Sequence, residues 1–188
     1  VDFWKISSYE ILWLKLFEKC SQTGLPIVFS TGIANISEIE DAVSQIKKGL
    51  TKDITILHCN STYPTPINEV NLRVLVSLRK HFKNNNNISI GWSDHSSLPS
   101  VIYRSVFKFN AKMVEFHLDL DGKGNEYKSG HCWLPEEIKN VINTIREGYI
   151  ADGDNKIQPS LSELSERDWR ADPQDGLRPM KNIRVSIE

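Results

Sequence analysis

The chain has 188 residues, of which 39% are hydrophobic and 25% charged, a composition typical of a globular domain with a large core. Its formal net charge of -1 provides no basic surface for nucleic acid or for an anionic membrane. No apolar run approaches the roughly 20 residues of a membrane helix, no signal peptide is recognisable, and three unrelated cysteines favour a reducing cytoplasm over a disulfide framework.

Five short apolar runs alternate with five amphipathic helix patterns between residues 1 and 150. The runs, which predict strands, are 2–8, 26–32, 54–59, 88–92 and 111–118. The helix patterns cover 11–24, 37–49, 70–78, 99–109 and 135–145. Ser37 followed by Glu40 indicates a capping box, and Pro135 with two acids after it suits the first turn of the last helix.

This alternation predicts a parallel α/β sheet with right-handed crossovers, which fits both a doubly wound sheet and a barrel. No Gly-x-Gly-x-x-Gly follows a strand, so a dinucleotide-binding fold has no support. Polar residues close all five predicted strands, as a (β/α)₈ TIM barrel requires. Because a barrel has eight strands and about 250 residues, we expect about five βα units here, strands 4 to 8. The chain opens on Val1 inside a strand-like run, and we take it to be a piece of a longer protein.

Two neighbouring predicted strands end in histidine, at His95 and at His117. Parallel strands lie about 4.8 Å apart, so the two imidazoles can converge on one divalent ion. The alternative is that each ring is hydrogen-bonded in a packed rim, as many partly buried histidines are. The residues alone leave both interpretations open.

Other polar side chains near the strand ends also have a functional and a structural interpretation. Lys5 would face an anion, or reach water at an edge of the sheet. Glu10 would accept a hydrogen bond from a sugar hydroxyl or lie on the surface, and Tyr63 would close a pocket or pack against its neighbouring prolines. Three serines would hold phosphate oxygens together with backbone N–H groups, or serve only as turn residues: Ser8, Ser30 and Ser93.

The segment 118–126 is acidic and rich in glycine. It predicts either a mobile cover whose carboxylates meet substrate or a solvated loop; these carboxylates are Asp119, Asp121 and Glu126. The His-Cys pair at 58–59 lies in a strand and is expected to pack in the core. The His-Cys pair at 131–132 does not form a zinc pattern, because no second close pair accompanies it.

Several motifs together resemble the N-acetylneuraminate (sialic acid) synthase family in order and spacing over roughly residues 1 to 150. They are Lys5-Ile-Ser-Ser-Tyr-Glu10, Phe29-Ser-Thr-Gly32, Leu57-His-Cys-Asn-Ser-Thr-Tyr-Pro-Thr-Pro66, Val70-Asn-Leu-Arg73, Gly91-Trp-Ser-Asp-His95 and Val114-Glu-Phe-His117. The resemblance implies a TIM-barrel enzyme that condenses phosphoenolpyruvate with an open-chain N-acylmannosamine-type sugar. The product is sialic acid or a related nine-carbon 2-keto acid, phosphate is released, and a divalent metal assists, Mn²⁺ first and Mg²⁺ as the alternative.

The resemblance also implies roles for single residues. His95 and His117 would ligate the metal. The phosphate and carboxylate of phosphoenolpyruvate would be bound by Lys5, Ser8, Ser30 and Ser93. The sugar or a metal-bound water would be contacted by the catalytic residues Glu10, Tyr63 and Asp94 and by the binding residues Ser61 and Glu126.

The sequence departs from the family pattern in two places. The family's cover loop often reads Gly-Pro-Asp, whereas this chain has Gly124-Asn-Glu126. Many members continue into an antifreeze-like domain. In this chain, residues 1–150 are expected to form a partial barrel domain and residues 151–188 a polar tail that wraps it.

A homo-oligomer is expected. The alternatives are a metal-dependent aldolase acting on pyruvate, which would lack the serine and lysine anion site, and a catalytically silent fragment that binds sugar phosphate or metal.

Overall fold

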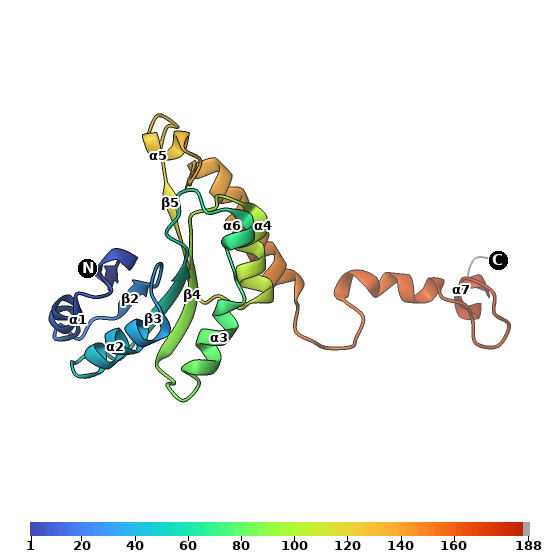
Figure 1. The fold of residues 1–188 in the computed structure, drawn as a ribbon. Helices are drawn as coiled ribbons and strands as arrows, with labels where there is room; N and C mark the ends of the chain where they lie inside the picture. The colour runs from blue at the N-terminus through green and yellow to red at the C-terminus, as the bar shows by residue number, and fades with distance from the viewer. Residues whose placement is uncertain (186–188) are drawn as a thin grey trace. The chain divides into compact units, whose positions relative to one another are not determined.

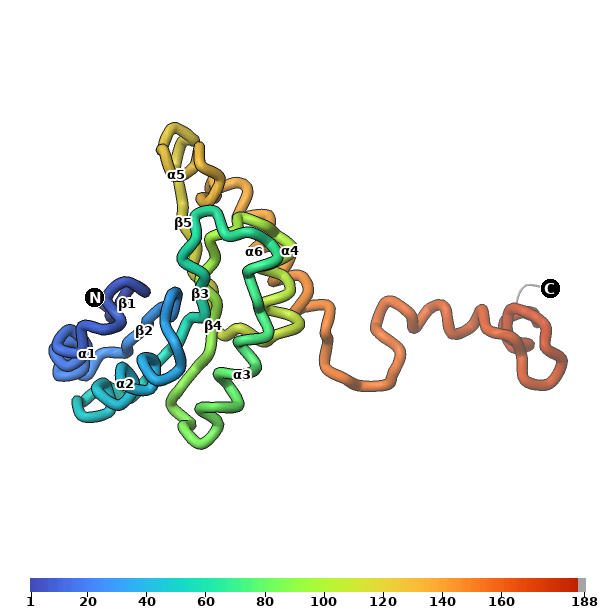
Figure 2. The backbone as a smooth tube through the Cα atoms, viewed as in Figure 1, coloured from blue at the N-terminus to red at the C-terminus, as the bar shows by residue number. Residues whose placement is uncertain are grey.

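The computed structural model describes residues 1–185, and within them six strands form one sheet (Figure 1). The strands are β1 (Trp4–Ile6), β2 (Ile27–Ser30), β3 (Ile54–Cys59), β4 (Ile88–Asp94), β5 (Val114–Leu118) and β6 (Cys132–Trp133). They pair in chain order, and every neighbouring pair is parallel. Figure 2 follows this path from the blue N-terminal segment to the yellow β5.

Helices connect the successive strands, as the sequence predicts. The connecting helices are α1 (Leu14–Ser21), α2 (Ile36–Lys47), α3 (Val74–His81), α4 (Pro99–Tyr103) and α5 (Asn125–Lys128). Two further helices, α6 (Pro135–Ala151) and α7 (Lys181–Val185), follow β6. A π-helical turn, η3 (Arg104–Lys108), extends α4. The 3-10 turns are η1 (Ser8–Glu10), η2 (Ile67–Glu69), η4 (Leu161–Glu163) and η5 (Ser165–Trp169).

The strand order distinguishes between the two architectures that the sequence leaves open. A doubly wound sheet reverses its strand order where the chain begins to lay helices on the second face. The order here runs from β1 to β6 without reversal in the described residues. With right-handed crossovers, such a sheet carries its connecting helices on one face, which is the arrangement of a barrel wall.

A contact between the first and fifth strands shows that this sheet is curled. Lys5 Nζ of β1 lies 3.3 Å from Glu115 Oε2 of β5, although three strands separate them. In a flat sheet with about 4.8 Å between strands, the two backbones would be about 19 Å apart, beyond the combined reach of both side chains. The sheet therefore bends, and the face that carries both side chains is concave.

The main apolar core lies between the sheet and its helices. Alternate strand residues enter it together with residues of α1, α2 and α3; the strand residues are Ile6, Ile27, Phe29, Ile54, Ile56, Ile90 and Trp92. The residues between them point to the concave face, because successive side chains of a strand alternate. A second cluster joins α4, β6 and α6 through Ile102, Trp133, Ile138 and Val141.

Two local features differ from the sequence-based expectation. The capping box of α2 begins two residues earlier than predicted: Asn35 Oδ1 accepts from the Glu38 N–H, and the Glu38 carboxylate accepts from the Asn35 N–H. The Ser37 hydroxyl donates to Asn35 Oδ1 and so supports this cap. The sixth strand, β6, was not expected, because two residues are too few to produce a periodic pattern.

The chain divides into two compact units, Val1–Gly148 and the residues from Tyr149 onward. In the second unit, buried Asp172 organises the loop that leads to α7. Its carboxylate accepts from the backbone N–H groups of Gln174 and Lys181 at 2.9 and 2.8 Å. The wrapping of this segment around the barrel stays a prediction. None of the helices within residues 1–185 combines the length and the apolar character needed to cross a membrane.

Gly91 allows β4 to approach its neighbours closely. A Cβ at this position would overlap the Met113 carbonyl oxygen and lie 2.6 Å from Leu57 Cδ2. We expect Gly91→Ala in the complete protein to lower the free energy of unfolding by about 1–3 kcal/mol, the usual cost of overpacking. Urea denaturation measures this change. Ser89→Ala, at an exposed position of the same strand, is the control, and equal stability of the two variants would contradict the packing.

Candidate functional site

The concave face carries a row of polar side chains where the strands approach their carboxyl ends. Lys5 forms its ion pair with Glu115 here, and both side chains are about one-third exposed or less. The Ser93 hydroxyl donates to Glu115 Oε1 at 2.9 Å, across the β4–β5 pairing of these two residues. The carboxylate of Glu115 therefore holds an ammonium and a hydroxyl in fixed positions on one surface.

A group of small polar side chains lies where β1, β2 and β3 end. The Gly32 N–H donates to Ser8 Oγ at 2.9 Å. A Cβ on Gly32 would lie 3.2 Å from Cys59 Sγ and would overlap Ser61 Oγ, so a larger residue here would displace the Ser61 side chain. Within residues 1–185, the buried hydroxyls of Ser30 and Ser61 have no hydrogen-bond partner. Buried polar groups are normally paired, so these hydroxyls remain available to a polar ligand.

Three histidines and a tyrosine gather beside this group. The ring centroids of His95 and His117 are 5.1 Å apart, and the ring of His131 lies 5.4 Å from that of His117. The Tyr63 ring contacts all three, with centroid distances of 4.2 Å to His95, 5.7 Å to His117 and 5.1 Å to His131. Cys59 Sγ, 3.8 Å from His95 Nδ1, joins the histidines to the serine group.

The tautomer of His95 follows from its surroundings. Its Nδ1 lies 2.8 Å from the Asn60 carbonyl oxygen, which can only accept, so Nδ1 carries the proton. The lone pair is then on Nε2. An imidazole held in this way by a backbone carbonyl is in the form that ligates a metal ion.

Burial and neighbouring charges set the protonation of the groups in this region. Burial raises the pKa of the Tyr63 phenol to about 12, and nearby acidic groups add to the effect, so the phenol stays a hydrogen-bond donor at neutral pH. Burial also raises the pKa of the Cys59 thiol, which keeps it neutral. The hydrogen bond from His117 lowers the pKa of the exposed Glu126 carboxyl and keeps it ionised.

Residues 1–157 match the NeuB family. The chain belongs to the NeuB family. It spans about half the length of the relatives that it matches. The N,N'-diacetyllegionaminic acid synthase of Campylobacter jejuni subsp. jejuni is 36% identical over 167 residues, which are 87% of this chain and 48% of that protein. The pseudaminic acid synthase of Helicobacter pylori is 31% identical over 166 residues, 87% of this chain and 47% of that protein.

A solved structure has the same fold. The crystal structure of N-acetylneuraminic acid (sialic acid) synthetase from Leptospira borgpetersenii serovar Hardjo-bovis, in complex with citrate, superposes with a TM-score of 0.71 at 29% sequence identity. The match covers 88% of this chain and 56% of that chain. The resemblance to the sialic acid synthase family that the motifs indicate is therefore confirmed.

In this NeuB family chain, most of the predicted site residues lie on the concave face or around the histidines. Asp94 does not share their direction, because it alternates with Ser93 and faces the helices. Its fully buried carboxylate accepts from Trp92 Nε1 at 3.2 Å, from the Ser96 hydroxyl at 2.7 Å and from the Ser97 N–H at 3.1 Å. Asp94 thus shapes the turn that carries His95.

Two further predicted carboxylates are engaged locally. Glu10 lies in η1, where its carboxylate accepts from the Ser7 hydroxyl. Asp119 accepts from the N–H groups of Asp121, Gly122 and Gly124 at 3.0, 2.8 and 3.0 Å, so it organises its own loop. The sequence predicts that His58 and Cys59 pack in the core. His58 does so, because its Nε2 lies 3.2 Å from the Val70 carbonyl oxygen and its ring packs against Trp92. Cys59, the next residue along the strand, points to the concave face.

The sequence analysis missed three residues of this region. Glu115 stands two positions before His117 in an otherwise apolar strand, and this spacing was sufficient to place both on one face. His131 and the adjacent Cys132 were set aside for lack of a second close pair in the sequence. The structure supplies partners from distant positions, because His117, Glu126, His131 and Cys132 each place a ligand atom within 4.8 Å of the others.

We expect Asp94→Asn to lower the free energy of unfolding of the complete protein by about 1–3 kcal/mol, because the new NH₂ group would leave buried donors unpaired. Urea denaturation with circular dichroism detection measures the change. Asp121→Asn is the control, since this side chain is exposed. An unchanged midpoint for Asp94→Asn would show that the hydrogen bonds around this carboxylate contribute little.

Proposed function

We propose that this chain is part of a nonulosonic acid synthase, an enzyme that condenses phosphoenolpyruvate with an N-acylmannosamine-type sugar and releases phosphate. In this proposal β1 to β5 are strands 4 to 8 of a TIM barrel. The observation that supports it most is that the ring centroids of His95 and His117 lie 5.1 Å apart. They lie beside Lys5, Glu115 and Ser93 on one concave face. Family membership and the named relatives support the same reaction class.

The lysine and serine groups suit the anionic substrate. The Lys5 ammonium has three N–H donors, of which one faces Glu115 and one donates to the Ile6 carbonyl at 2.9 Å. The third is free to bind a phosphate or carboxylate oxygen. The unpaired hydroxyls of Ser30 and Ser61 would add neutral donors. Pyruvate, which has no phosphate, would leave part of this site unused, and the aldolase alternative is correspondingly weaker.

The donor set around His95 fits a divalent metal, for which we propose Mn²⁺ with Mg²⁺ as the alternative. His95 would offer Nε2. His117, whose Nδ1 lies 3.3 Å from Glu126 Oε2, would also offer Nε2. Two protein ligands leave positions for substrate and water, as a catalytic metal requires. When bound, the metal would act as a Lewis acid on the sugar aldehyde.

The remaining roles belong to the protein side chains. Lys5 and the serines would hold phosphoenolpyruvate so that its enol carbon faces the aldehyde carbon, since positioning alone lowers the barrier substantially. Carbon–carbon bond formation leaves a cation at C2, to which water adds before phosphate departs. Tyr63 would cover the histidines, and its phenolic O–H would donate a hydrogen bond to a sugar oxygen. Glu115 would orient Lys5 and Ser93.

In the complete protein, we expect His95→Ala and His117→Ala each to lower kcat by at least about 100-fold, because the aldehyde would lose its Lewis acid. Phosphate release from phosphoenolpyruvate in the presence of N-acetylmannosamine and Mn²⁺ measures the activity. A chelator should abolish it and Mn²⁺ restore it. His81→Ala is the control, because His81 is an exposed histidine of α3 that pairs with Glu40 of α2. Unchanged activity in both site variants would overturn the proposed metal role.

A further inference from the structure

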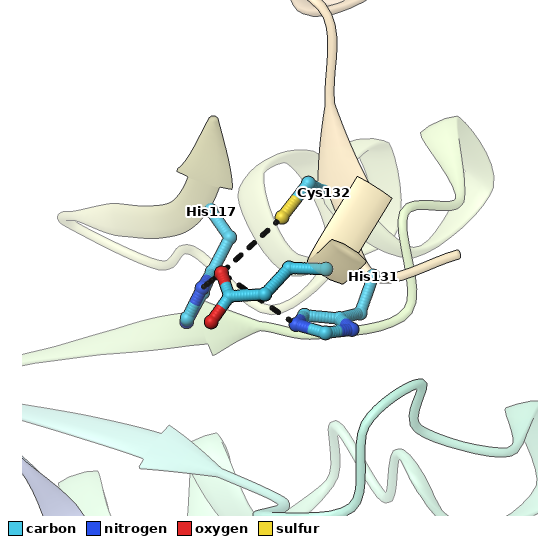
Figure 3. Close-up of side chains that lie close together, drawn as sticks. His117, His131 and Cys132 are labelled. Atoms are coloured by element: carbon cyan, nitrogen blue, oxygen red, sulfur yellow. Dashed lines mark hydrogen bonds and ion pairs between the residues drawn. The ribbon is translucent and has the colours of Figure 1, made fainter. Parts of the chain in front are cut away.

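His131 is a buried histidine to which the proposed function gives no role. Its side chain is 7% exposed, and its ring centroid lies 5.4 Å from that of His117 and 5.1 Å from that of Tyr63. Figure 3 shows His131 close to His117, with dashed lines for the contacts around them. The pairing of β5 with β6 brings His117 opposite Cys132, so the sheet fixes the adjacent His131 beside a proposed metal ligand.

The hydrogen bonds around His131 determine which of its two nitrogens carries the proton. The Ser129 hydroxyl has a single proton, which it donates to the Glu126 carbonyl oxygen at 2.9 Å. The same Ser129 oxygen therefore accepts from His131 Nδ1, which is 2.9 Å away. In the neutral ring Nε2 then holds the lone pair, so Nε2 can act only as a hydrogen-bond acceptor.

The Nε2 atom of His131 is an acceptor without a donor. Glu126 Oε2 lies 3.9 Å from it, beyond the usual hydrogen-bond distance of about 2.7–3.2 Å, and a carboxylate oxygen is itself an acceptor. Within residues 1–185 no side chain or backbone group donates to this nitrogen. Buried polar groups are normally paired, so a ligand that donates a hydrogen bond would complete the site.

The Glu126 carboxylate is a second acceptor, and its position is fixed. Its Oε2 accepts from His117 Nδ1 at 3.3 Å and from the Cys132 thiol at 3.7 Å. A carboxylate has about four lone-pair sites, so it can accept further hydrogen bonds. The contact at Nδ1 also leaves Nε2 of His117 for the proposed metal. The two acceptors, Glu126 and His131, therefore form a pair beside the metal position without competing for it.

The chemistry of this acceptor pair indicates which substrate it would bind. Two hydroxyls on adjacent carbons can each donate to one of the two acceptors. The phosphate of phosphoenolpyruvate is disfavoured here, because the Glu126 carboxylate would repel it. The sugar has such hydroxyls, and in the proposed reaction its aldehyde lies at the metal between His95 and His117. Tyr63, which contacts the rings of His95 and His131, would cover the chain of carbons between them.

We infer that His131 is a sugar-binding residue that contributes to substrate specificity. Its Nε2 accepts a hydrogen bond from one hydroxyl of the open-chain sugar, while Glu126 accepts from the neighbouring hydroxyl. This inference rests on the proposed function and extends it to the part of the sugar that the site recognises. A sugar without these hydroxyls would leave a buried acceptor unpaired, and a site of this kind discriminates strongly against such a substrate.

Substitution of His131 in the complete protein tests this contact. His131→Phe keeps a planar ring but loses the acceptor, and we expect the KM for N-acetylmannosamine to rise at least about 5-fold, the effect of one lost hydrogen bond. The KM for phosphoenolpyruvate and the affinity for Mn²⁺ should not change. His131→Gln, which offers an amide oxygen, should restore most of the loss. His81→Phe, the same change at an exposed histidine, is the control and should leave every value unchanged.

A binding measurement separates the sugar contact from turnover. The sugar alcohol obtained by reducing N-acetylmannosamine is open-chain and has no aldehyde, so it binds without reacting. In calorimetry with Mn²⁺ and phosphoenolpyruvate present, we expect His131→Phe to weaken its binding at least about 5-fold and His131→Gln to weaken it less.

Unchanged sugar KM and unchanged sugar alcohol affinity in His131→Phe would overturn the inference. An equal rise in the KM for phosphoenolpyruvate would also overturn it, because it would show a merely structural role. A protein that binds the sugar alcohol through His131 but releases no phosphate would contradict only the proposed function. A Mn²⁺-dependent synthase whose sugar KM does not respond to His131→Phe would contradict only the sugar contact.

Discussion

The rest of the structure depends on the curvature of the sheet, and the ion pair between Lys5 and Glu115 shows that curvature. It joins the first strand to the fifth across 3.3 Å, which a flat sheet with strands about 4.8 Å apart cannot allow. The curvature separates two faces with different chemistry. Apolar residues pack against the helices on the convex side, and the polar residues that alternate with them are directed toward a shared concave surface.

The separation of the sheet into an apolar convex face and a polar concave face explains why the candidate site combines groups from every part of the sheet. Ser93 is the register partner of Glu115 in the β4–β5 pairing, and the turn after β4 places His95 next to His117. Asp94 supports that turn from the other face through its buried hydrogen bonds. The residues that hold the site together and those that would meet substrate thus alternate along a single strand.

Much of this arrangement could be predicted because it depends on alternation and on strand ends. The apolar runs and the polar residues that close them gave the parallel sheet, the five main strands, and the proximity of His95 and His117. Asp94 was grouped with its neighbours by motif, although period two turns it to the opposite face. The cluster of His117, Glu126, His131 and Cys132 was out of reach, because β6 is too short to leave a sequence signal and its pairing alone unites these positions.

The curvature of the sheet can be tested by a double-mutant cycle on Lys5→Met and Glu115→Gln, with stability of the complete protein measured by urea denaturation. If the two side chains are in contact, the cycle should give a coupling free energy of at least about 0.5 kcal/mol. If the strands lay about 19 Å apart, as in a flat sheet, the two changes would be additive within about 0.3 kcal/mol. Such additivity would contradict the curled sheet and with it the concave site.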